Sequence, residues 1–257
     1  MIKLAADLTV LFQELPFAAR FSAAQAAGFA GVSLASPYDG PVQDLRDRLV
    51  LSGLMFAAMQ APPPNYTGAP PGFAATPGGE ERFQRDFKRM LRYAEVLKPG
   101  AIEILTGPEG DTGTLLRNLR WAVAEAPRRV FTLAPRPGGS FLQSYDQLAE
   151  LLAEVDADNL GLCLDTATAV ALGDAPAAVA ERFGADLRHV ALASAPDRAE
   201  PGLDGVDVAG FLNQLAAAGY KGWISADYTP KLTTAAGLGW MPPAPVAAPK
   251  KRKKPGG

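Results

Sequence analysis

The stretch GLCLDTATAVALGDAPAAVAERFGADLRHVALAS, residues 161–194, holds one copy of the pattern that decides the fold. An apolar run opens it at Gly161–Leu164 and another closes it at His189–Ala193. Neither run alternates strictly with polar residues, which is typical of strands buried on both faces. The longer mixed segment between them favours a helix. Strand, helix and strand in this order predict two parallel strands joined by a helical crossover.

The same alternation extends along the chain. We predict strands near Lys3–Leu8, Gly31–Ala35, Met55–Met59, Ala101–Leu105, Val130–Ala134, Gly161–Leu164, His189–Ala193 and Gly222–Asp227. The clearest helix is Glu80–Leu97, whose apolar residues recur every three or four positions. We therefore expect an α/β fold, a (β/α)8 TIM barrel of eight parallel strands and about seven helices over residues 1–241. The segment Pro230–Met241 takes the place of the last helix.

Composition narrows the functional classes. The chain has 257 residues, is 48% hydrophobic and 20% charged, and carries a formal net charge of -2. These values fit one globular body and argue against a strongly basic nucleic-acid-binding domain. The single cysteine, Cys163, allows neither an intramolecular disulfide nor a thiolate cluster for a metal. No secretory leader pattern and no run of 18 apolar residues is found, so we expect a cytoplasmic protein with no membrane span.

Two segments fall outside the alternation. Ala61–Gly79, a Pro/Gly-rich connection after the third predicted strand, is typical either of a lid over an active site or of a structureless insertion. Residues 242–257, PPAPVAAPKKRKKPGG, lack apolar periodicity and are expected to be a disordered basic tail. The run Lys250–Lys254 is typical of a solubilising tail, or alternatively of a patch that binds nucleic acid or another polyanion.

Four carboxylates lie at or near predicted strand ends, where the active sites of barrels are built. Asp165 ends GLCLD and Asp227 ends GWISAD; Asp7 and Glu103 lie in the first and fourth strands. A carboxylate buried there is costly unless it is paired or binds a metal, so each is a candidate site residue. Alternatives remain: Asp165 suits a helix N-cap, Asp7 a loop hydrogen bond, and Glu103 an ion pair with a neighbouring arginine.

Other reactive side chains carry weaker signals. His189, the only histidine, opens its strand and is typical of a buried core residue. Cys163 lies in mid-strand and is expected to be inert. Arg198 and Glu200, in the loop APDRAEP (195–201), are candidates for substrate binding, since the guanidinium can hold an oxyanion in two-point fashion; a surface ion pair is the alternative. No phosphate-binding glycine motif is present.

Several motifs together resemble the hydroxypyruvate isomerase family of xylose-isomerase-like barrels. They are SPYD (36–39), LDT (164–166), HVALASAPDRAEP (189–201), GYKGWISADYTP (219–230) and GLGW (237–240), in the family's order and spacing. The resemblance spans about Leu4 to Trp240. It implies a barrel enzyme that moves a carbonyl between adjacent carbons of a small hydroxy-carbonyl compound. Such chemistry needs acid–base groups and a cation or other electrophile for the enediolate.

The resemblance also implies four metal ligands, only part of which this chain carries. Asp165 matches the sixth-strand aspartate, and Asp227 stands where the family has a glutamate. The fifth-strand glutamate is placed at Leu133 and the seventh-strand ligand at Ala191. Two aspartates and water would make only a weak site for Mg or Mn, so no cofactor is expected, with such a weak site as the alternative.

Two functions remain open. The first is a non-catalytic or repurposed barrel, a pseudoenzyme that binds a small hydroxy-carbonyl or sugar-like ligand or a partner. The second is an active isomerase or epimerase, converting for example hydroxypyruvate to tartronate semialdehyde through Asp227, Asp165 and Glu103. Nucleic acid is expected only through the tail, and a homo-oligomer is compatible with the sequence.

Overall fold

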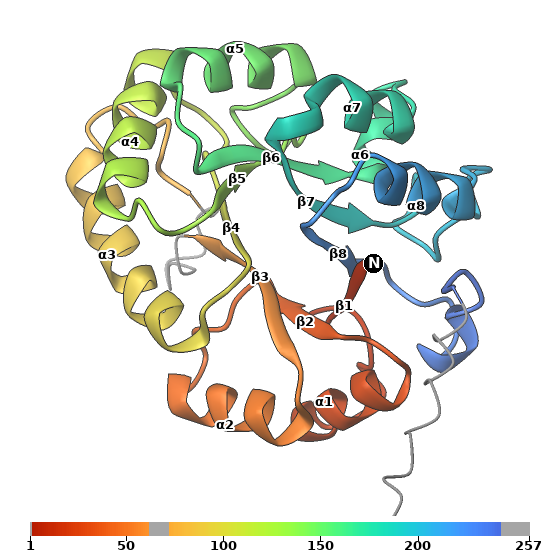
Figure 1. The fold of residues 1–257 in the computed structure, drawn as a ribbon. Helices are drawn as coiled ribbons and strands as arrows, with labels where there is room; N and C mark the ends of the chain where they lie inside the picture. The colour runs from red at the N-terminus through yellow and green to blue at the C-terminus, as the bar shows by residue number, and fades with distance from the viewer. Residues whose placement is uncertain (1, 62–71, 243–257) are drawn as a thin grey trace, which may run out of the picture.

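The computed structural model describes residues 2–61 and 72–242, which form a closed barrel of eight parallel strands (Figure 1). The strands pair in chain order, and the eighth closes the ring on the first. They are Lys3–Asp7 (β1), Gly31–Leu34 (β2), Met55–Ala61 (β3), Ala101–Ile104 (β4), Phe131–Leu133 (β5), Leu160–Asp165 (β6), Leu187–Leu192 (β7) and Trp223–Ala226 (β8). The predicted fold class is confirmed.

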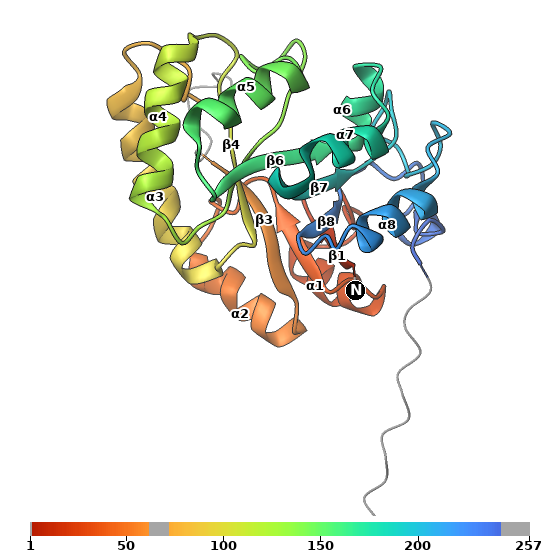
Figure 2. The ribbon, with the colours of Figure 1, turned by 45° about the horizontal axis from the view of Figure 1, so that its top comes forward.

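Helices surround the strands (Figure 2). They are Phe17–Ala26 (α1), Val42–Ser52 (α2), Glu80–Leu97 (α3), Thr112–Glu125 (α4), Tyr145–Val155 (α5), Thr166–Ala171 (α6), Pro176–Phe183 (α7) and Val208–Ala217 (α8). The described part of the chain thus has eight α-helices against the predicted seven, because two short ones follow β6. Between β8 and residue 242 the only helical segment is a 3-10 turn at Ala235–Gly237, as the missing last helix predicts. None of the described helices is long and apolar enough to cross a membrane.

The main hydrophobic core lies between the strands and the helices. Along most strands every second residue faces outward into it, and α3 contributes Phe83, Phe87 and Met90 from one face. Phe131 of β5 packs on Phe87, with the ring centroids 5.3 Å apart. This layer fixes the direction in which each strand presents its remaining side chains. Those side chains point into the barrel and build the site.

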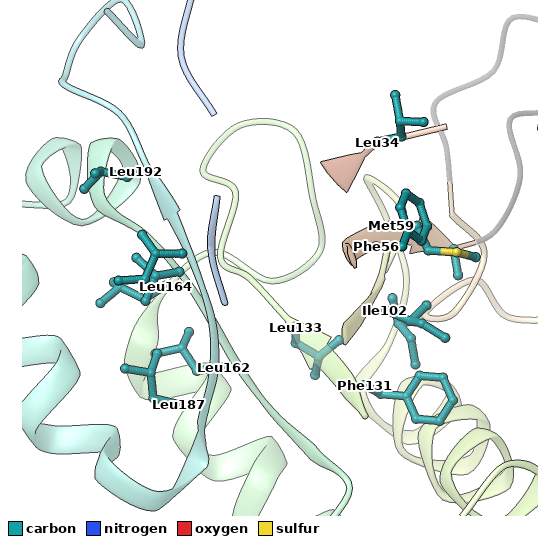
Figure 3. Packing of buried hydrophobic residues seen from close by; sticks show 14 of the residues in the cluster. Leu34, Phe56, Met59, Ile102, Phe131, Leu133, Leu162, Leu164, Leu187 and Leu192 are labelled. Atoms are coloured by element: carbon teal, nitrogen blue, oxygen red, sulfur yellow. The ribbon is translucent and has the colours of Figure 1, made fainter. Parts of the chain in front are cut away.

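Leu133 belongs to the outer layer, which corrects its placement at the cavity. It lies with Leu162 and Phe131 in the main core cluster and is fully buried (Figure 3). Its neighbour Thr132 lines the interior cavity instead. The family's fifth-strand ligand position was therefore placed one residue away from an inward-facing position. On a strand, a shift of one residue moves a side chain to the opposite face.

A tryptophan closes the amino-terminal end of the barrel. Trp223 of β8 packs with Ala5 and Ala57 on the inner face. Its ring occupies the space that side chains would need at two glycines: a Cβ at Gly31 would lie 2.8 Å from the ring, and one at Gly100 2.6 Å. The interior is thus solid at this end and open only at the carboxyl ends of the strands.

Two predictions fall wholly or partly outside the described residues. The lid predicted at Ala61–Gly79 includes residues 62–71, and the tail predicted at 242–257 includes residues 243–257; neither range is described. Residues 76–79 lead into α3, and the described residue Asn118 donates a 2.8 Å hydrogen bond to the carbonyl of Ala74. Both the lid and the disordered tail stay predictions.

Candidate active site

A cavity of about 260 Å³ opens at the carboxyl ends of the strands. Its charged and polar lining comes from all eight strands and the loops that follow them: Asp7, Thr9, Ser33, Gln60, Glu103, Thr132, Arg136, Cys163, Asp165, His189, Arg198, Ser225 and Asp227. The structure therefore brings together five of the six predicted site residues, namely Asp7, Asp165, Asp227, Glu103 and Arg198. At about 30 Å³ per water molecule, the cavity has room for a ligand of roughly nine heavy atoms.

Arg198 joins the two aspartates of the site. One guanidinium nitrogen, Nη1, lies 2.5 Å from Asp165 Oδ2, and the other, Nη2, lies 2.7 Å from Asp227 Oδ2. Nη2 also donates to the backbone carbonyl of Asp227 at 3.0 Å. Burial works to lower the pKa of Arg198, but the two carboxylates outweigh it, and the pKa is raised. The predicted surface ion pair is therefore an ion pair inside the cavity.

Asp165 also caps a helix. Its Oδ1 accepts a 3.0 Å hydrogen bond from the backbone N–H of Thr168, in the first turn of α6. The N-cap alternative is confirmed, and the same carboxylate lines the cavity, with one oxygen on the helix and the other on Arg198. The helix end fixes the orientation of the carboxylate that holds the guanidinium.

A second ion pair lies across the cavity. Arg136 Nη2 donates to Glu103 Oε1 in a very short contact, and Arg136 Nε reaches the same oxygen at 3.2 Å. Gln60 Nε2 donates to the other oxygen, Glu103 Oε2, at 3.0 Å. The negative charge of Glu103 raises the pKa of Arg136. The predicted alternative for Glu103, an ion pair with an arginine, is confirmed.

Asp7 and Asp227 form a pair of interacting carboxylates. Asp7 Oδ1 accepts from the backbone N–H of Thr9 at 2.7 Å, and Oδ2 accepts from Ser33 Oγ at 3.0 Å. Burial raises the pKa of Asp7 in spite of these hydrogen bonds. Burial and the charge of Asp7 raise the pKa of Asp227 to about 7, although Arg198 opposes the shift. Asp227 is therefore poised to exchange a proton near neutral pH.

His189 and Cys163 lie deeper in the cavity. His189 is 5% exposed, and its Nδ1 has no hydrogen-bond partner among the described residues. Burial lowers its pKa to about 4, so the imidazole is neutral at pH 7. Burial raises the pKa of the Cys163 thiol well above its usual range, which keeps the sulfur protonated and a poor nucleophile.

Two alanines pack against Cys163 beside the cavity. Ala134, which follows β5, and Ala191 of β7 form a small apolar cluster with Cys163. After the one-residue correction, Ala134 rather than Leu133 is the last inward position of the fifth strand. A slip along this segment brings in no carboxylate, since residues 130–147 contain no glutamate and their only aspartate is the exposed Asp146.

The donor set does not fit the divalent cation that the resemblance implies. A hard cation such as Mg²⁺ takes about six oxygen ligands, and here two ligand positions carry methyl groups. The two aspartates are both paired with the guanidinium of Arg198, and Glu103 is paired with that of Arg136. Within residues 2–61 and 72–242 no group of three or more His, Cys, Asp or Glu side chains suits a metal ion.

Glu200 is placed differently from the other predicted residues. It does not line the cavity: Oε1 accepts a 2.7 Å hydrogen bond from the backbone N–H of Lys231, in the segment after β8. Its Oε2 is buried and has no partner among the described residues. The observed contact anchors the chain after β8, and a role for Glu200 in substrate binding stays a prediction.

Sequence reasoning missed Arg136 and Gln60 and gave His189 no part in the cavity. Arg136 stands two residues after the last inward strand position, in the loop that begins PRPGG, which was a usable signal. Gln60 shares a face with Ala58 in β3, and strand alternation identifies it once the strand is placed. For His189 no sequence signal shows that the central cavity extends deep enough into the barrel to reach this residue.

A larger cavity, of about 440 Å³, lies beside the site between the segments after β1 and β2. It shares Thr9 and Leu34 with the central cavity and is lined by apolar residues together with Arg20, Arg48 and two aspartates. Arg20 is already engaged with the carbonyls of Leu8 and Leu15. Because this cavity lacks converging acid–base groups, the smaller one is the candidate active site.

Comparison with known proteins agrees with this fold. The sequence profile of xylose isomerase-like TIM barrels matches residues 21–244. A 2-oxo-tetronate isomerase of Cupriavidus necator is 32% identical, covering 95% of this chain and 98% of the relative. A hydroxypyruvate isomerase of Escherichia coli is 29% identical over 95% and 99%. A crystal structure described as an AP endonuclease, family 2, from Brucella melitensis superposes with a TM-score of 0.88 at 28% identity, covering 93% and 98%.

Proposed function

This chain belongs to the xylose isomerase-like TIM barrel family, within the group of hydroxypyruvate and 2-oxo-tetronate isomerases, and from this premise we propose that it isomerises or epimerises a small hydroxy-carbonyl acid. The observation that carries the proposal is Asp227, a carboxylate at the mouth of the cavity whose pKa is raised to about 7. A general base or acid works best when its pKa lies near the working pH.

Asp227 supplies the proton transfer in this proposal. Its carboxylate takes the proton from the carbon beside the carbonyl, and the electron pair left behind forms a carbon–carbon double bond. The former carbonyl oxygen takes up the negative charge, which gives an enediolate. Return of a proton to the former carbonyl carbon, with transfer of the proton of the neighbouring hydroxyl to the former carbonyl oxygen, completes the isomerisation without net oxidation.

Charge and size support a small acid as the substrate. The cavity has room for roughly nine heavy atoms, which suits an oxo acid of three or four carbons. Arg136 uses Nε and Nη2 for Glu103, so its Nη1 remains to hold a substrate carboxylate. Glu103, at the end of that ion pair, is the candidate second acid–base group, and Asp165 holds Arg198 in place.

The test is turnover by the full chain. Hydroxypyruvate and a four-carbon 2-oxo acid are each supplied, and the isomerised product is followed by nuclear magnetic resonance, which also detects exchange of the substrate proton in D₂O. We expect Asp227→Asn to lower the rate by about 10²- to 10⁴-fold, the usual effect of a positioned acid–base group. Asp47→Asn, the same change on the exposed face of α2, is the control and should leave the rate unchanged.

A second candidate is ligand binding without turnover. It is favoured by Ala134 and Ala191, which place methyl groups where the resemblance implies metal ligands. Calorimetric binding of hydroxypyruvate with neither isomerisation nor proton exchange would support it. Full activity in Asp227→Asn would contradict the role given to that residue and show that another group transfers the proton.

A further inference from the structure

The strongest unexplained feature of the cavity is the guanidinium held between two carboxylates. Arg198 spans Asp165 and Asp227 through separate nitrogens, at 2.5 and 2.7 Å. Those are the two aspartates that the resemblance assigns to a divalent cation. One positive group therefore already occupies the space between them. A planar fork bridges two carboxylates in a way that the point charge of a lysine does not.

The backbone around Arg198 is built to hold this side chain in position. Arg198 has a φ of +52°, in the left-handed region that side-chain-bearing residues rarely adopt. Its carbonyl accepts a 2.7 Å hydrogen bond from the N–H of Thr229. The next residue, Ala199, exchanges two backbone hydrogen bonds with Ser194, at 3.0 and 3.1 Å. A strained residue fixed from both sides is typical of a functional position.

Among the described residues, the other positions of the site do not form a metal-binding group. Ala191 stands beside Asp165 across the β6–β7 pair, and Ala134 lies in the same apolar cluster. Glu103 is committed to Arg136 and Gln60. A cation entering between the aspartates would have to displace Arg198, and the neighbouring carboxylate of Asp7 is already hydrogen-bonded to Thr9 and Ser33.

We propose that the Arg198 guanidinium is the resident cation of this site, neutralising Asp165 and Asp227 and facing the enediolate oxygens in place of a divalent metal. The inference rests on the proposed function for the identity of the oxyanion. The pairing of Arg198 with the two aspartates, and its attraction for an anion, do not depend on turnover. Arg198 keeps donor hydrogens beyond those bound to the aspartates, since a guanidinium carries five. A preformed positive group in a recessed cavity is well suited to an oxygen on which charge develops.

The first test uses the unaltered chain and Mn²⁺ alone. Free Mn²⁺ is followed by electron paramagnetic resonance as the protein is titrated up to millimolar metal. We expect no saturable binding, and the isomerase rate should not change after treatment with a chelator. Saturable Mn²⁺ binding that disappears in Asp165→Asn would overturn the proposal, whether or not the protein turns over a substrate.

The second test measures an anion that resembles the enediolate. Oxalate is a planar dianion, and its dissociation constant is measured by calorimetry with no metal added. We expect Arg198→Gln to weaken oxalate binding at least tenfold, and Arg198→Lys to weaken it less, because charge remains while the fork is lost. Arg182→Gln is the control, since Arg182 forms an exposed ion pair with Asp146.

The two tests separate the two proposals. Unchanged oxalate affinity in a folded Arg198→Gln variant would refute the role of the guanidinium. If that variant fails to fold, the Mn²⁺ titration of the unaltered chain still tests whether a divalent metal occupies the site. Oxalate and Mn²⁺ results as expected, with no isomerisation of any substrate, would refute the proposed enzymatic function and leave the resident cation standing.

Discussion

The single histidine allows a direct test of how dry the barrel interior is. His189 is 5% exposed, and burial lowers its pKa from 6.5 to about 4. In the unfolded chain the imidazole titrates near 6.5. Between these two values the unfolded chain binds a proton that the folded chain does not. The free energy of unfolding therefore falls as the pH drops through this window, and His189 makes no pH-dependent contribution above it.

The size of the effect follows from the two pKa values. The full difference corresponds to about 3 kcal/mol, of which about 2 kcal/mol is already lost at pH 5. Other carboxylates titrate in the same range, so the measured quantity is the difference between the unaltered protein and His189→Gln. That difference should shift by about 2 kcal/mol in favour of the variant between pH 7.5 and pH 5.

Two measurements check this. Because the chain has one histidine, its imidazole gives one set of nuclear magnetic resonance signals, and their titration reads the pKa directly. Urea unfolding at several pH values gives the stability difference. A titration midpoint near 6.5, or a stability difference that stays constant from pH 5 to 7.5, would refute the claim that burial keeps the His189 imidazole neutral.

Three further expectations test other parts of the structure. Because the pKa of Asp227 is raised to about 7, kcat/KM should rise with pH and reach a plateau above it, with about a tenth of the plateau at pH 6; a flat profile would show that another group moves the proton. Arg136→Ala leaves Glu103 without its cation and should cost about 2 kcal/mol in urea unfolding, less than a fully buried pair because the Arg136 side chain is 37% exposed. A loss below about 0.5 kcal/mol, the range of exposed pairs, would contradict this. Gly161→Ala places a Cβ 2.1 Å from a backbone carbonyl oxygen and should cost about 1–3 kcal/mol, whereas Gly139→Ala meets no atom within 4 Å and should be neutral; equal stabilities would refute the packing argument.

The sequence alone determined the barrel and the end of it that carries the site. Apolar runs such as Gly161–Leu164 alternate with amphipathic segments such as Glu80–Leu97, and this local pattern reflects the burial of strands under helices. The carboxylates Asp165 and Asp227 stand at strand ends, so their convergence on one cavity is a consequence of the fold. Periodicity and strand direction are properties of short segments, and the features that depend on them could therefore be predicted.

The tertiary structure alone decided which groups pair. Strand alternation moves a side chain to the other face with each residue, so a one-residue error put Leu133 in the cavity, whereas β5 in fact directs Thr132 inward. Arg198 and Arg136 reach carboxylates that lie 33 residues away in the chain, and no local pattern records such a contact. The pKa values of Asp227 and His189 depend on burial and on charges gathered from several strands, and these exist only once the barrel has closed.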